Sequence, residues 1–138
     1  MRVLPCLVFV LACGDTALPT STETACPDPD PGEPSYDSFG RQFMTDYCVS
    51  CHSSQLPRSQ RHGAPLYHDF DSLGGVFQTA NHIDQQAGIG PAAENFFMPP
   101  ERCPSQPGTV LDIDCPMPTE AERRELALWI ACEMLRPH

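Results

Sequence analysis

The chain has no lysine, and its eight basic residues, all arginine, stand against 18 acidic residues. The formal net charge is −10 at neutral pH, so binding to nucleic acid or to anionic lipid through charge is excluded as a main activity. We therefore expect no nucleic-acid partner, and a protein partner should present a basic surface. The acidity is also compatible with a role in solubility alone.

Long apolar runs are scarce as well. The run from Val3 to Ala12 is shorter than the roughly 20 residues that a membrane-spanning helix needs. It follows a basic residue near the start of the chain, a pattern typical of a signal peptide, which we place at residues 1–12. Eight cysteines in 138 residues also favour an oxidising compartment.

The end of this run, Ala12-Cys13-Gly14, resembles the lipobox of bacterial lipoproteins. The resemblance implies cleavage before Cys13, a lipid anchor on that residue, and a position on the periplasmic side of a bacterial membrane. A soluble periplasmic or secreted protein is the alternative.

Residues 13–34 contain many prolines and acidic residues but few apolar side chains that could be buried. Such a composition favours disorder, stiffened by proline. We predict a disordered tether that holds a folded domain, residues 35–138, away from the membrane.

The most informative stretch is Cys48-Val49-Ser50-Cys51-His52. C-x-x-C-H is the signature of covalent haem attachment, in which both sulfurs form thioethers and the histidine ligates the iron. A thiol redox pair is an alternative, but it favours a βαβ setting and no strand pattern precedes the motif. Half of a zinc site is another, but the remaining cysteines are too scattered to supply a second close pair.

A second axial ligand is predicted in Asn95-Phe96-Phe97-Met98-Pro99-Pro100. A methionine thioether is a soft, neutral ligand that raises the reduction potential of haem iron. The prolines fix the backbone around Met98, and we expect Phe96 and Phe97 to exclude water from its side. Met117 is the runner-up, and His68 and His82 are weaker candidates.

Helical patterns occupy three regions of the domain. Tyr36, Phe39, Phe43 and Tyr47 lie on one helical face and predict a helix from about Ser35 to Tyr47. A second helix is predicted from Asp69 or Asp71 to about Gln86. Thr119 and Glu122 form a capping box that predicts a last helix, with Leu126, Trp129, Ile130 and Leu135 on its buried side.

Cys6 belongs to the predicted signal peptide. Once Cys13 and the two motif cysteines are set aside, four cysteines of the mature chain remain, and they allow three disulfide pairings. We prefer Cys103–Cys115 with Cys26–Cys132. The first would close the loop after Met98, and the second would fasten the tether to the last helix.

Together these features resemble a small class I, c-type cytochrome domain over residues 35–138. The resemblance implies an all-α fold of three to four helices around one covalent haem c, with His52 and Met98 as iron ligands. It also implies that a carbonyl of residues 55–57 accepts the second N–H of His52. Arg58 and Arg61 could contact the haem propionates or be solvated.

The implied function is one-electron transfer to or from a redox protein. No pair of catalytic side chains or activated nucleophile is evident, so we expect a carrier rather than an enzyme. A haem enzyme is the first alternative, either a peroxidase or the electron-entry domain of a larger oxidoreductase. A haem sensor or a structural lipoprotein is the second.

Overall fold

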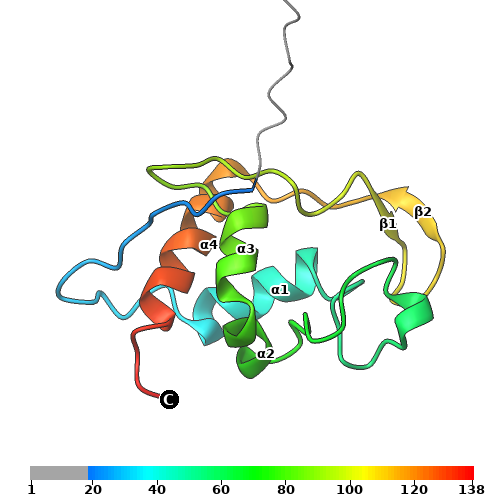
Figure 1. The fold of residues 1–138 in the computed structure, drawn as a ribbon, viewed down its shortest axis with the longest axis horizontal. Helices are drawn as coiled ribbons and strands as arrows, with labels where there is room; N and C mark the ends of the chain where they lie inside the picture. Colours follow the sequence, from blue (N-terminus) through cyan, green and yellow to red (C-terminus); the bar gives the residue numbers. More distant parts are fainter. Residues whose placement is uncertain (1–18) are drawn as a thin grey trace, which may run out of the picture.

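The computed structural model describes residues 19–138 (Figure 1). The predicted signal peptide, the predicted lipidation site Cys13 and the first part of the predicted tether lie outside the described residues. Within them, no helix combines the length and the apolar character needed to cross a membrane. The elements in chain order are η1 (Tyr36–Gly40), α1 (Arg41–Tyr47), η2 (Arg58–Gln60), α2 (Leu73–Gln78), α3 (Ala80–Ala87), β1 (Arg102–Pro104), β2 (Leu111–Asp114) and α4 (Glu120–Glu133).

The first helical segment begins with one π-helical turn, η1, which continues directly into α1. Ser35 caps it, since its hydroxyl accepts the backbone N–H of Ser38 and the Ser38 side chain accepts the N–H of Ser35. Phe43 and Met44 are buried. The predicted helix from Ser35 to Tyr47 is confirmed.

The last helix, α4, also starts where the sequence predicts. The Thr119 hydroxyl accepts the N–H of Glu122, and the Glu122 carboxylate accepts the N–H of Thr119. Leu126, Trp129 and Ile130 are buried, as expected. Leu135 is wrongly included in the buried stripe, because it lies past the end of α4 and is exposed.

The two end helices cross where Gly40 meets Trp129. A Cβ atom built on Gly40 would lie 2.3 Å from a carbon of the Trp129 ring. Only a glycine therefore permits this approach. The indole is fully buried, and Tyr36 and Phe39 pack around it with ring centroids 6.2 Å away. This contact forms the centre of the apolar core.

The predicted second helix is two helices. Ser72, rather than Asp69 or Asp71, caps α2 by accepting the N–H of Gly75. Thr79 then interrupts the helical path with φ −135° and ψ 19°, and α3 starts anew at Ala80. Val76, Ala80 and Ile83 are buried in the same core.

The predicted all-α fold class is wrong, because the chain also forms a two-stranded antiparallel sheet. Strand β1 pairs with β2, with Cys103 opposite Ile113. The disulfide Cys103–Cys115 closes this hairpin. Figure 1 shows the hairpin at one end of the molecule and the C-terminus near the other. The fold is thus a mixed one, with helices and a small sheet.

Residues 19–34 differ from the predicted disordered tether. The segment lies along the folded domain, with Thr22 buried and Cys26 bonded to Cys132 in α4 (Figure 1). Composition alone favours disorder here, but polar hydrogen bonds and a disulfide replace the apolar contacts that the segment lacks. The structure contains both disulfides of the preferred pairing.

Two glycines provide a matched test of the helix crossing. Gly40→Ala should lower the free energy of unfolding by about 1–3 kcal/mol, because the rigid Trp129 ring cannot move away from the added methyl group. Gly74→Ala in α2 should raise it by about 0.5–1 kcal/mol, since alanine is the better helix former and no atom lies within 4 Å. Urea unfolding measures both. Equal effects would contradict the assigned crossing.

Candidate functional site

A cavity of about 780 Å³ brings the predicted site residues together. This volume lies in the range of pockets that hold organic ligands and cofactors. Cys48, Cys51, His52 and Met98 all line it, although η2, α2 and α3 separate Met98 from the motif in the sequence. Other parts of the wall are formed by Pro19, His62, His68, Phe70, His82, Ile83, Ala87, Pro99, Arg102, Cys103 and Leu111.

The two motif cysteines follow directly from the end of α1. Backbone hydrogen bonds from Cys51 and His52 to the carbonyl of Cys48 fold the motif into a turn. Neither sulfur forms a disulfide in the described structure. Removal from water raises the pKa of Cys48 to about 12 and also raises that of Cys51. Both are therefore thiols at neutral pH, which argues against an activated thiolate redox pair.

The imidazole of His52 is held on two sides. Its Nδ1 lies 3.2 Å from the carbonyl oxygen of His68. A carbonyl can only accept a hydrogen bond, so Nδ1 carries the proton of the neutral ring and Nε2 keeps its lone pair. The ring of Phe70 stacks on the imidazole at 4.6 Å. The predicted acceptor among residues 55–57 is therefore wrong.

Burial lowers the pKa of His52 to about 4. The ring is consequently neutral at neutral pH, which is the form that binds a metal. The hydrogen bond to the His68 carbonyl orients such a ligand in the way that is usual for metal-bound histidines.

Arg61 organises the loop that supplies this carbonyl. It is 2% exposed, and its guanidinium donates to the carbonyls of Ser53, Pro65 and His68 and to the Asp69 carboxylate, at 2.6–2.8 Å. These bonds engage Arg61, so its proposed contact with a propionate is not available. Arg58 is exposed and does not line the cavity.

Met98 lies at the end of a loop that is fixed through its backbone. Its N–H donates to the carbonyl of Gln86 at 2.9 Å, and its own carbonyl accepts from Nη1 of Arg123 at 2.8 Å. The side chain of Met98 is 39% exposed and lines the cavity. Backbone anchoring thus holds Met98 at the wall of the cavity, where it is partly exposed.

Arg123 in α4 is the main support of this loop. Its Nη1 also reaches the carbonyls of Ala87 and Asn95, at 3.0 and 3.2 Å. The side chain is 2% exposed, and its Nε has no hydrogen-bond partner within the described part of the chain. Burial lowers the pKa of Arg123. This role was not predicted from the sequence, because nothing in the sequence distinguishes Arg123 from the neighbouring Arg124.

Two predictions about the residues around Met98 and about its alternative, Met117, need correction. Phe96 and Phe97 do not exclude water from Met98, since they are 52% and 41% exposed. Arg123 lies over the Phe96 ring instead, 5.1 Å from its centroid. Met117, the runner-up ligand, is exposed and does not line the cavity.

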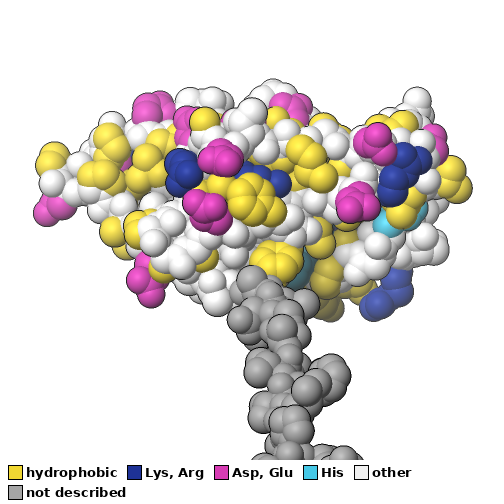
Figure 2. Space-filling model, turned by 90° about the horizontal axis from the view of Figure 1, so that it is seen from above, with side chains coloured by type: hydrophobic (Ala, Val, Ile, Leu, Met, Phe, Trp, Pro, Cys, Tyr) yellow, Lys and Arg dark blue, Asp and Glu magenta, His cyan; other side chains and the backbone are white. Residues whose placement is uncertain are grey.

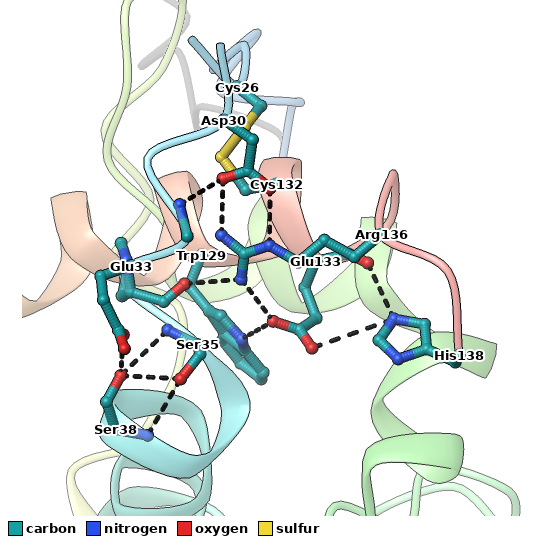
Figure 3. Close-up of polar contacts among 12 residues, drawn as sticks. Cys26, Asp30, Glu33, Ser35, Ser38, Trp129, Cys132, Glu133, Arg136 and His138 are labelled. Atoms are coloured by element: carbon teal, nitrogen blue, oxygen red, sulfur yellow. Dashed lines mark hydrogen bonds and ion pairs between the residues drawn. A yellow bond between two sulfur atoms is a disulfide. The ribbon is translucent and has the colours of Figure 1, made fainter. Parts of the chain in front are cut away.

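A second group of potential metal ligands is ruled out by its bonding. Cys26, Asp30 and Cys132 lie within 4.8 Å of one another. Figure 3 shows that the two sulfurs are bonded together and that Asp30 pairs with Arg136. The group therefore offers no thiolate to a metal.

Comparison with family models, with curated proteins and with solved structures finds no match. Together with the sheet, this result overturns the predicted membership of the class I cytochrome c family. The resemblance rested on the attachment motif, on the Met98-Pro99-Pro100 segment and on helix order, and none of these specifies the whole fold.

Arg61 and Arg58 provide a matched test of the loop that positions His52. Arg61→Met should lower the free energy of unfolding by about 2–4 kcal/mol, because it leaves buried carbonyls and Asp69 without a donor. Arg61→Lys should recover little of the lost stability, since an ammonium group cannot reproduce the planar set of N–H donors of a guanidinium. Arg58→Met should stay within about 0.5 kcal/mol of the original protein.

Urea unfolding of the three variants measures these differences. A stable Arg61→Met protein would show that the loop does not need the buried guanidinium.

Proposed function

We propose that the protein is a one-electron carrier that holds one covalent haem c in the cavity described above. Cys48 and Cys51 would bind it as thioethers, and His52 and Met98 would be the two iron ligands. The observation that carries the proposal is that the attachment motif and the distant Met98 line the same cavity. Haem iron supplies a one-electron couple between its ferric and ferrous states when bound.

The motif cysteines fit the attachment reaction. Each thiol adds across one vinyl group, with the sulfur bonding one carbon and the hydrogen going to the other, so no oxidant or reductant is consumed. Both cysteines line the cavity, and neither forms a disulfide within the described residues. Their spacing of three positions suits two neighbouring vinyl groups.

The two ligand residues fit complementary roles. His52 offers a neutral imidazole whose Nε2 is unprotonated, while its Nδ1–H is engaged by the His68 carbonyl. Met98 offers a neutral sulfur on a loop held by Gln86 and Arg123. Phe70, Ile83 and Leu111 add apolar side chains to the wall, which suits a porphyrin ring.

The proposed setting is an oxidising compartment, the periplasmic side of a bacterial membrane. Two disulfides support this setting. The lipid anchor on Cys13 remains a prediction. Acidic side chains are spread over the face in Figure 2, with apolar side chains between them. A redox partner with a basic surface would complement this charge.

Covalent attachment is tested by extraction with acidified acetone. The protein, produced together with a cytochrome c maturation system, should keep its red colour in the precipitate. Replacing Cys48 and Cys51 together by alanine should abolish retained colour, because no thioether can form. The control Ser50→Ala changes the same turn and should retain it. Colour that leaves the original protein on extraction would refute covalent attachment.

Ligation by Met98 is tested by absorption spectroscopy. Ferric protein should show the weak absorption band at the red end of the visible spectrum that marks methionine sulfur bound to iron (the near-red band). Met98→Ala should lose this band completely. The reduced variant should then bind carbon monoxide, because one iron position is open. Met117→Ala is the control and should leave the band unchanged.

A high-spin spectrum, with carbon monoxide binding to the reduced original protein, would contradict the closed site. That outcome would favour a haem enzyme or a gas sensor over a carrier.

A further inference from the structure

The segment before the first helix contacts the loop that carries Met98. We call residues 20–30 the N-terminal strap and residues 88–98 the methionine loop. Thr22 of the strap is 1% exposed, although it is polar and belongs to a segment with almost no apolar residues. A buried threonine in such a segment must have partners that compensate for its lost hydration.

Those partners are the two carboxylate oxygens of Asp84 in α3. The backbone N–H of Thr22 donates to Oδ2 at 2.8 Å, and its hydroxyl donates to Oδ1 at 2.7 Å. Both bonds are buried, and bonds to a charged acceptor are stronger than neutral ones. Thr22 thus fixes the strap to α3.

The hydrogen bonds around Thr22 and Asp84 continue into the methionine loop through Asn95. Asn95 donates through Nδ2 to the carbonyl of Thr20 at 2.8 Å and to that of Asp84 at 3.0 Å. The carbonyl of Thr22 accepts the N–H of Ala92 at 2.9 Å. Strap and loop also approach so closely that a Cβ on Gly90 would lie 2.2 Å from the Thr24 hydroxyl.

The far end of the strap is fastened to α4, as Figure 3 shows. Cys26 is bonded to Cys132, and Asp30 accepts from Nε and Nη2 of Arg136 at 2.7 and 2.8 Å. Arg136 also donates to the buried Glu133 carboxylate. The strap is therefore fixed at both ends, and the methionine loop lies against its first residues.

We propose that Thr22 is a positioning residue for Met98, a role that rests on the proposed function. Phe96, Phe97 and Met98 are 52%, 41% and 39% exposed, so apolar packing contributes little to holding this part of the loop. Polar bonds hold it instead, from Arg123 on one side and from the Thr22, Asp84 and Asn95 group on the other. Loosening that group should allow Met98 to leave the iron more easily.

The test is a titration of the ferric protein with imidazole, a neutral ligand that competes with Met98 for the iron. Thr22→Val keeps the shape of the side chain but removes the hydroxyl donor to Asp84. The affinity for imidazole should rise about tenfold, which is the effect of 1.4 kcal/mol. Loss of the near-red band reports the displacement directly. If Thr22→Val does not fold, Thr22→Ala removes the same hydroxyl with less bulk.

Two variants provide the controls. Thr22→Ser restores the hydroxyl and should return the affinity to within about twofold of the original protein. Thr45→Val removes an exposed hydroxyl that donates within α1, to the carbonyl of Arg41, and should change nothing. If Thr22→Val lowers the melting temperature but leaves the imidazole affinity unchanged, Thr22 has only a structural role and the proposal is overturned.

Met98→Ala supplies the decisive background. With no methionine to displace, Thr22→Val should leave the imidazole affinity unchanged. A tenfold increase that persists in this background would show that Thr22 acts by another route, and would overturn the proposal.

Hydrogen exchange separates failure of this proposal from failure of haem binding, because it does not need the cofactor. In Thr22→Val, the amides of Ala92 and Met98 should exchange about tenfold faster than in the original protein. The amides of α1 should not change. Unaltered exchange in the methionine loop would overturn the proposal even if the haem site is correct. If the protein produced with the maturation system carries no covalent haem, the proposed haem site is refuted. Faster exchange in Thr22→Val would then still show that Thr22 holds the methionine loop.

Discussion

The close contact between Gly40 and the Trp129 ring is the constraint on which the arrangement of the chain depends. No side chain other than hydrogen fits at Gly40, so η1 and α4 can approach until the indole fills the space between them. The indole N–H donates to the buried Glu133 carboxylate, which also accepts from Arg136. The crossing is therefore fixed by shape on one side of the ring and by hydrogen bonds on the other.

Helix α4 contacts three separate parts of the structure at different points along its length. Arg123, near its start, holds the methionine loop through backbone carbonyls. Trp129 anchors the core, and Cys132, one turn later, holds the N-terminal strap. Because these residues share one rigid helix, the core contact at Gly40 also sets where the loop and the strap lie. A helix of 14 residues is thus enough to connect the core with the candidate site.

Local features were predictable from the sequence, and non-local ones were not. The capping box of Thr119 joins residues three positions apart, and the aromatic face that predicts the first helix repeats within one short segment, so the sequence displays both directly. The ordered strap does not show in composition, because Thr22 finds its partner Asp84 across 62 positions. The hairpin was missed for a related reason: its pairing, such as Cys103 with Ile113, joins two short strands without an alternating apolar pattern.

Some residues of the candidate site were likewise predictable from the sequence and others were not. Cys48, Cys51, His52 and Met98 were identified because their chemical types and spacing point to one cofactor, and all four line one cavity. Arg61 and Arg123 were not recognised as supports, because arginine in a sequence gives no indication that carbonyls will surround it. A five-residue motif specifies the chemistry of attachment, whereas the fold around it is a separate property. The supports of Met98 must therefore be sought in the contacts of this chain, and those contacts lead to Arg123 and to the strap.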